Sequence, residues 1–311
     1  MDFFISLSLT LVIVSAIPIR EQFFKGYSAD LFKGYNDGVM LSAIPRGRFT
    51  AATVMLLVTT FCYLARYTNT LKAFILHPIF LVYLVSATFA LSLGGRLYFI
   101  SALFSVMVYL SLFRNANVTF KQAILLGVVA IASFTSYGVI RAGGSFATNA
   151  AITNLLQEPL LTSLSLFSFL SYDNSIMIGQ LNLFFIDFLN LIPSSLLPDK
   201  LGLLADPRDY GFQYNMPLGG LHLYVSAVMK LGVFLMIAAS YFFGVYMAWM
   251  QNKSYGSITS SVIYSLICGW LVFSFYRDPW FVSLVKNIFE FSIVVPLLLS
   301  FLARGNRKCR R

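Results

Sequence analysis

Eight apolar runs follow one another along this chain, and each is long enough to cross a membrane as a helix. A helix rises 1.5 Å per residue, so about 20 residues span a hydrocarbon core about 30 Å thick. Backbone groups cannot hydrogen-bond to lipid, and these runs lack the alternation of barrel strands, so helices are expected. We therefore predict an all-α, polytopic membrane protein that forms one integral membrane domain over residues 1–311. The predicted spans are 3–19, 49–65, 73–93, 97–113, 123–140, 223–250, 258–276 and 281–302.

The composition excludes an ordinary soluble domain. Hydrophobic residues make up 58% of the chain and charged residues only 11%, whereas soluble domains carry about 25% charged residues. The net charge of +10 does not indicate nucleic-acid binding, because the Lys and Arg residues lie beside the apolar runs, where they orient helices. Cys62 and Cys268 lie in apolar runs and Cys309 lies in the basic tail, so neither a disulfide framework nor a metal centre is expected. No cofactor is predicted.

The distribution of basic residues predicts the topology. Residues 304–311 form the densest basic cluster and are therefore expected in the cytoplasm. Alternation of the spans then places the N-terminus in the cytoplasm and residues 141–222 on the outer face, as one large loop. Within this loop, residues 178–197 mix polar with apolar side chains and are expected to form an interfacial or re-entrant helix. Residues 155–172 are a second such candidate, and two full spans in this region would raise the total to ten.

Several cationic side chains are predicted to meet at the outer face. Arg96, Arg141 and Arg277 lie at the ends of different predicted helices, and His222 begins the sixth span. Basic residues are disfavoured in short connections on the outer face, so the presence of these side chains there needs an explanation. They either anchor helices at the interface, beside its aromatic residues, or they form a binding site. The sequence leaves both interpretations open.

The chemistry of these residues suits a phosphorylated lipid. Arginine stays charged and presents a fork that matches phosphate oxygens, and it would stabilise the charge that develops on a departing pyrophosphate. The absence of an Asp-x-Asp motif favours a metal-free reaction. His222 is a candidate general base because its ordinary pKa is about 6.5. Its alternative role is that of a helix cap.

Three further ionisable residues lie inside predicted spans, where they are functional candidates by default: Lys230, Lys286 and Glu290. Lys286 lies about two turns below the outer end of its helix and would add to a phosphate site, although a stabilising pair with Glu290, four residues later, is the simpler interpretation. Lys200 and Arg208, in the large loop, complete the candidate substrate-binding cations. The acids of the loop cannot be ranked as bases from the sequence.

An ordered set of motifs covers roughly residues 85–300. It comprises Gly94-Gly-Arg96, Gly138-Val-Ile-Arg141, Ile192-Pro-Ser-Ser-Leu-Leu-Pro-Asp-Lys200, Gly219-Gly-Leu-His222, Lys230-Leu-Gly-Val-Phe234 and Phe275-Tyr-Arg277. On these motifs the chain resembles the oligosaccharide repeat-unit polymerases, the Wzy-type O-antigen polymerases of bacterial inner membranes. Members of that family have more spans, so the resemblance implies that this chain is short at its N-terminal end.

The resemblance implies the polymerase/ligase fold, a helical bundle with a large periplasmic loop carrying the active site. The implied enzyme is a glycosyltransferase that moves the growing glycan from undecaprenyl pyrophosphate to a new lipid-linked repeat unit, with Arg96, Arg141 and Arg277 binding pyrophosphate. A chain-length regulator and a flippase of the same pathway become candidate partners, besides membrane lipids. The alternatives are an O-antigen ligase that transfers the glycan to lipid A-core and a transporter of lipid-linked oligosaccharide.

Overall fold

The computed structural model describes residues 2–25, 47–68, 70–93, 96–113, 163–171, 179–192, 222–274 and 285–308, with a few isolated residues between them. This part of the chain contains helices and no strands, as predicted. The helices are α1 (Asp2–Ala16), η1 (Ile17–Ile19), α2 (Arg20–Lys25), α4 (Gly47–Tyr67), α5 (Leu71–Ile75), α6 (Pro78–Ser92), α7 (Arg96–Phe113), α10 (Leu181–Asp187), η3 (Phe188–Leu191), α12 (Leu223–Ser254), α13 (Ile258–Ser274), η6 (Val285–Val294) and α15 (Val295–Lys308).

Three helical stretches are long and apolar enough to cross a membrane: Asp2–Ile19, Arg48–Tyr67 and Leu223–Ser254. Four shorter apolar helices, Pro78–Ser92, Tyr98–Phe113, Ile258–Val272 and Asn287–Leu302, fall within other predicted spans. Helices that could cross a membrane by length and composition are thus present, as predicted, whereas the total of eight or ten and the outer position of residues 141–222 stay predictions. The predicted span 123–140 lies almost entirely outside the described residues.

Several predicted spans are not single α-helices, and two of them change at a proline. The span predicted at 73–93 is divided, because α5 ends at Ile75 and α6 begins at Pro78, with the Nδ1 atom of His77 accepting the backbone N–H of Ile79. Proline suits the first turn of a helix, where its missing N–H is not needed. The described part of the last span begins as the π-helix η6 and becomes α-helical in α15. Pro296, at the start of α15, cannot donate to the preceding turn and crowds its carbonyls, so a wider turn before it relieves the conflict.

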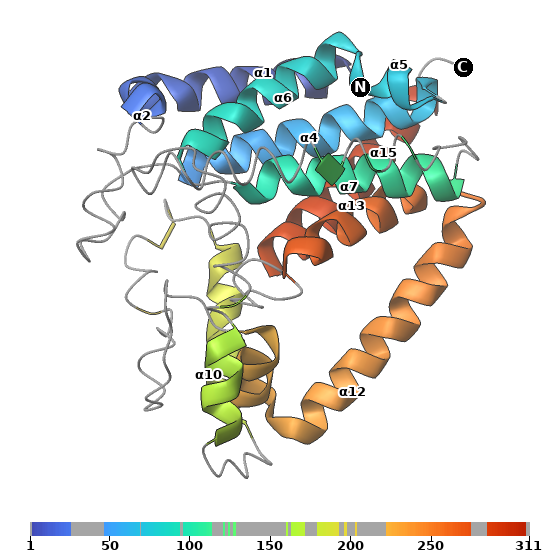
Figure 1. Ribbon diagram of the computed structural model, residues 1–311. Helices are drawn as coiled ribbons and strands as arrows, with labels where there is room; N and C mark the ends of the chain where they lie inside the picture. The colour runs from blue at the N-terminus through green and yellow to red at the C-terminus, as the bar shows by residue number, and fades with distance from the viewer. Residues whose placement is uncertain are drawn as a thin grey trace.

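A bundle of α1, α4, α6, α7 and α13 forms the upper part of the molecule in Figure 1. The closest packing lies between α7 and α13, where Gly269 faces two serines spaced four residues apart. A Cβ atom at Gly269 would lie 2.1 Å from Ser105 Oγ and 2.4 Å from the carbonyl oxygen of Ser101. Small residues at this spacing let helix backbones approach closely, which is how helices associate in lipid.

Large aromatic residues fill the rest of the bundle core. Trp270, Phe61, Tyr83 and Tyr109 are fully buried. Both tyrosine hydroxyls donate to backbone carbonyls of neighbouring helices: Tyr109 to Ala65 at 2.7 Å and Tyr83 to Tyr98 at 2.6 Å. Ala65 is close to the end of α4, where helix carbonyls lack partners in their own helix, so the Tyr109 bond satisfies one of them.

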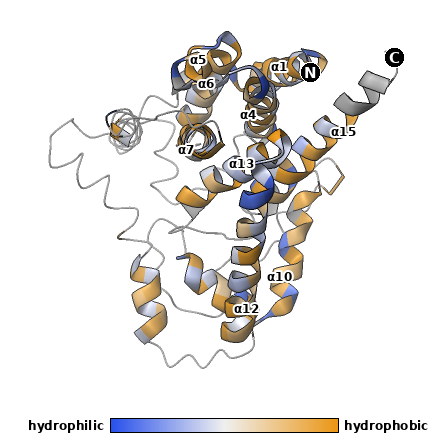
Figure 2. Cartoon of the chain, turned by 90° about the vertical axis from the view of Figure 1, so that its right-hand side faces the viewer, coloured by the Kyte–Doolittle hydropathy of each residue, from blue (hydrophilic) through white to orange (hydrophobic). Residues whose placement is uncertain are grey.

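Helix α12 is interrupted by a break in its backbone at Gly232, where φ is 74° and ψ is 168°. Residues 225–232 are buried, whereas most side chains after the break are partly or fully exposed. Figure 1 shows the longer part of α12 leaving the bundle beside α13 and running down towards α10. Figure 2, which colours the chain by hydropathy, shows hydrophobic residues at intervals along α12. Exposed apolar side chains all along a helix are expected where lipid surrounds it.

Candidate functional site

The candidate site lies in a small group of helices, which we call the broken-helix module. It consists of helical residues 163–171, α10 with η3, and α12 up to Gly232. Phe169 packs there with Val225, Val228 and Met229 in a second hydrophobic core, separate from that of the bundle. Residues 163–171 and 179–192 both belong to the large loop predicted at 141–222.

A buried ion pair holds the module together. The Lys230 ammonium group donates a hydrogen bond to the Asp187 carboxylate, joining α12 to the last residue of α10. Lys230 is 4% exposed and Asp187 only 1% exposed. Burial raises the pKa of Asp187, and the hydrogen bond from Lys230 opposes that rise. Because taking two charges out of water is expensive, such a pair is weak support for a purely stabilising role.

Close to the break in α12, backbone atoms of the segment before α10 contact backbone atoms of α12. In a continuous helix, the carbonyl of Met229 would accept the N–H four residues later. Here it accepts the N–H of Gln180 at 3.0 Å. The chain before α10 lies so close that a Cβ atom at Gly179 would be 2.3 Å from the nitrogen of Gly232. Two glycines therefore allow the contact, one by its backbone conformation and the other by its lack of a side chain.

His222 caps the N-terminus of α12. Its Nδ1 atom accepts the backbone N–H of Tyr224 at 3.2 Å, and its own backbone N–H donates to Ser165 Oγ at 2.9 Å. Partial burial lowers the pKa of His222, so the ring is neutral near pH 7. A neutral ring whose Nδ1 accepts a hydrogen bond carries its proton on Nε2. In this arrangement His222 offers a donor, and it accepts a proton only after releasing the Tyr224 N–H.

His222 and the ion pair belong to the same short helix segment. Lys230 follows His222 by eight residues, which corresponds to about 12 Å along the helix axis. The module therefore carries a polar group at each end of the buried part of α12, with the Gly232 break beyond Lys230.

The structure describes only some of the predicted site residues. Arg96 is the first residue of α7 and Lys286 lies in η6, and for both the structure describes the backbone alone. Element η3 of the module contacts η6, so the helix that carries Lys286 packs against it. The structure does not describe the side chain of Lys286, so the Lys286–Glu290 pair stays a prediction. The remaining predicted site residues also lie outside the described residues: Arg141, Lys200, Arg208 and Arg277.

Asp187 was not selected from the sequence, although Lys230 was recognised as an ionisable residue within a span. Nothing in the sequence pairs the two, because 43 positions separate them and Asp187 is one of several loop acids. The sequence does offer one signal for such a contact. The segment around α10 carries polar residues among apolar ones, and these would need hydrogen-bond or ionic partners if the segment were buried. Among the described residues, no group of three or more His, Cys, Asp or Glu side chains is placed to hold a metal ion.

Comparison of the chain with protein-family models, curated proteins and solved structures gives no match in any of the three. The resemblance to the repeat-unit polymerases therefore rests on the sequence motifs alone.

Proposed function

We propose that this protein is an integral membrane enzyme that joins lipid-linked oligosaccharide repeat units into a surface polysaccharide. The growing glycan would leave undecaprenyl pyrophosphate and pass to the non-reducing end of an incoming lipid-linked unit. The proposed setting is the inner membrane of a bacterium, with both termini in the cytoplasm and the reaction on the periplasmic face. The observation that carries the proposal is the buried Lys230–Asp187 pair beside the break in α12.

Two properties of this arrangement support a reaction site. Ionisable groups buried in apolar membrane proteins are costly and are found mainly at functional positions. In addition, a second helical segment of α12 begins after the break, and the start of a helix carries a partial positive charge. Such a helix start attracts anions, and Lys230 lies two residues before the break. A pyrophosphate group fits an environment of this kind.

The proposed roles follow from the chemistry of each group. Arg96, Arg141 and Arg277 would hold the pyrophosphate and stabilise the charge that develops as it leaves, with Lys286, Lys200 and Arg208 as further substrate contacts. His222 would act on the attacking sugar hydroxyl after its ring releases Tyr224. Asp187 is the alternative base, provided that Lys230 turns to the phosphate when substrate binds.

The test is the lipopolysaccharide ladder of a deletion strain complemented with variants. We expect wild type to restore the full ladder, and Arg141→Ala or Lys230→Met to leave a single repeat unit on the lipid A-core. Lys253→Met is the matched control, because Lys253 is an exposed lysine at the other end of α12. Full ladders from both site variants, at wild-type protein levels in the membrane, would contradict the proposal.

A transporter of lipid-linked oligosaccharide is the second candidate, and the Gly232 break favours it. Transporters bind substrates at discontinuous helices, where helix ends face the ligand. The same complemented deletion strain distinguishes these candidate functions. Loss of a transporter leaves no repeat unit on the surface, whereas loss of an O-antigen ligase leaves polymer on the carrier lipid. Only loss of a polymerase leaves the core capped with one unit.

A further inference from the structure

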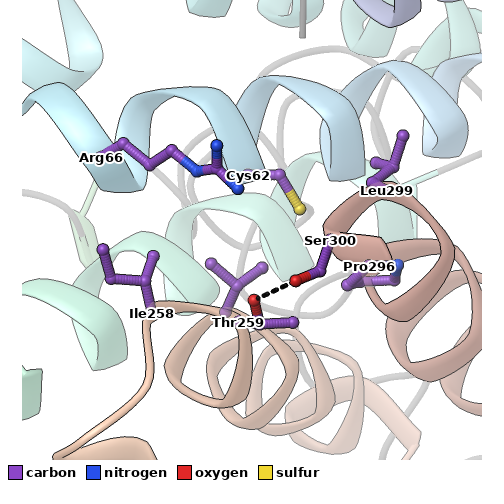
Figure 3. A pocket seen from close by; sticks show the side chains of 8 residues that line it. Cys62, Arg66, Ile258, Thr259, Pro296, Leu299 and Ser300 are labelled. Atoms are coloured by element: carbon purple, nitrogen blue, oxygen red, sulfur yellow. Dashed lines mark hydrogen bonds between the residues drawn. The ribbon is translucent and has the colours of Figure 1, made fainter. Parts of the chain in front are cut away.

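The C-terminal helix α15 turns one face towards the bundle and the other face away from it. Figure 3, drawn around a small pocket between α4, α13 and α15, shows Pro296, Leu299 and Ser300 on the face towards the bundle. Leu299 is buried, and Ser300 Oγ accepts a hydrogen bond from the hydroxyl of Thr259 in α13 at 3.1 Å. These contacts define which side of α15 is turned away from the rest of the described protein.

The outer face of α15 is strongly apolar. Leu297 is 51% exposed, Leu298 54%, Phe301 75% and Leu302 46%. Four large apolar side chains left uncovered within six residues would be costly in water, so a surface of this kind calls for an apolar partner. The acyl chains of a bilayer are such a partner, and these four residues belong to an apolar helix within the last predicted membrane span.

This apolar face continues directly into basic residues. Along α15, Leu297, Phe301, Arg304 and Lys308 follow one another at intervals of four, three and four residues. Residues three and four apart lie on the same side of a helix, and the backbone of α15 is helical as far as Lys308. Positions 304 and 308 therefore lie on the line of Leu297 and Phe301. The helix changes from apolar to cationic along this line within about 16 Å.

The charge at this end of α15 has one sign. Residues 304–311 contain five Lys and Arg residues and no acid. Arg66, in the last turn of α4, lies beside the same junction of helices, and Lys253 precedes the start of α13 by five residues. Even with Asp2, which opens α1, counted at this end, the balance is strongly positive. A positive surface next to an apolar one is complementary to a ligand with an anionic head and apolar tails.

We propose that the outer face of α15 binds an anionic phospholipid, with the acyl chains against Leu297 and Phe301 and the headgroup against Arg304 and Lys308. Basic residues directly beyond a membrane helix attract anionic lipid headgroups. A phospholipid covers both parts of this face, whereas a soluble anion covers only the cationic part. The proposal does not depend on the polymerase function, because α15 carries none of the residues assigned to it.

The test is native mass spectrometry of the full-length protein, purified in a mild detergent and incubated with equal amounts of phosphatidylglycerol and phosphatidylcholine that carry the same acyl chains. The two lipids differ in net headgroup charge, and we expect wild type to retain phosphatidylglycerol in preference. The double variant Arg304→Gln and Lys308→Gln should lower that preference by about tenfold or more, because both cations attract the anionic headgroup. Arg304→Lys combined with Lys308→Arg should preserve it, because both charges remain. Phe301→Ser should weaken retention of both lipids.

The double variant Arg20→Gln and Arg48→Gln is the matched control, because it also removes two exposed cations. Arg48 lies in the first turn of α4, and Arg20 begins α2, which packs beside that turn, at the end of α4 opposite Arg66. The control should keep the wild-type lipid preference. An unchanged preference after loss of Arg304 and Lys308, in a monodisperse protein, would overturn the proposal, as would an equal loss in the control. Displacement of phosphatidylglycerol by an equal concentration of inorganic phosphate would also overturn it, because the site would then take a free anion.

Discussion

The bundle and the broken-helix module are built from similar apolar sequence but are held together by different forces. In the bundle, α7 and α13 meet through Ser101, Ser105 and Gly269, and aromatic side chains fill the remaining space. In the module, the segments are joined by a buried ion pair and by a backbone hydrogen bond to Met229, and two glycines allow their close approach. The first arrangement is stabilised by close packing, which is the general solution for helices in lipid.

This difference indicates where the function lies. Close packing of small residues is robust and needs no charged group. A buried charge pair beside a helix break is costly in an apolar surrounding and could be replaced by apolar residues without loss of stability. The module therefore retains a costly arrangement that the bundle avoids, and the variants below separate its stability from its activity.

The largest effect is expected from removing one partner of the ion pair. Asp187→Leu removes the carboxylate that faces the buried Lys230 charge, and Lys230→Met removes the ammonium group that faces the buried Asp187. Each should destabilise the protein by about 3–5 kcal/mol. The double variant Lys230→Met and Asp187→Leu should recover most of this loss while remaining inactive on the lipopolysaccharide ladder. Thermal unfolding in detergent measures the stability. A double variant as unstable as the single variants would show that the ion pair itself is needed for stability.

A slightly smaller effect is expected where the bundle is most tightly packed. Gly269→Ala places a Cβ atom against Ser105 Oγ and the carbonyl of Ser101, and both belong to a rigid helix. Overpacking of this kind costs about 1–3 kcal/mol. Gly244→Ala is the control, because nothing lies within 4 Å of a Cβ atom there, and it should be neutral or slightly stabilising. Melting temperatures of the two variants should differ by several degrees, and equal values would contradict the packing argument.

The break in α12 gives the third prediction. The φ and ψ angles of Gly232 lie in a region that is essentially restricted to glycine. Gly232→Ala should cost about 1–3 kcal/mol or straighten the helix, which would move Lys230 away from Asp187. We expect a lost or shortened ladder from this variant and a normal one from Gly244→Ala. A normal ladder from Gly232→Ala would show that the break is not needed for activity.

The sequence predicts the bundle better than the module, for physical reasons. Membrane helices follow from local composition, because each must satisfy its backbone internally and present an apolar surface. For that reason each of the seven apolar helices that the structure describes coincides with a predicted span, to within about four residues at its ends. Breaks inside them are harder to predict. Gly232 follows Lys230 by two residues inside a span that is otherwise largely apolar, and the sequence does not show the contact with Gly179 that occurs at the break.

The site residues show the same limit. His222 was expected either as a base or as a cap, and the structure shows the cap, while its part in catalysis stays a prediction. Lys230 stood out as a charge in a span, but its partner Asp187 depends on a long-range contact that one sequence does not encode visibly. The arginines Arg141 and Arg277 lie outside the described residues, so their predicted roles stay predictions.

The smallest expected effect concerns the pH dependence of the module. Partial burial lowers the pKa of His222 below its ordinary value of 6.5. The folded state therefore prefers the neutral ring, and this contribution to stability is present above pH 6.5 and is lost as the pH falls towards the lower folded value. Protonation also removes the Nδ1 acceptor for the Tyr224 N–H, so the start of α12 should loosen. His222→Asn keeps a capping side chain without a titrating group and should abolish this dependence. Hydrogen exchange of residues 223–231 between pH 5.5 and 7.5, corrected for the intrinsic rate, measures it. Equal pH dependence in both proteins would show that another group titrates.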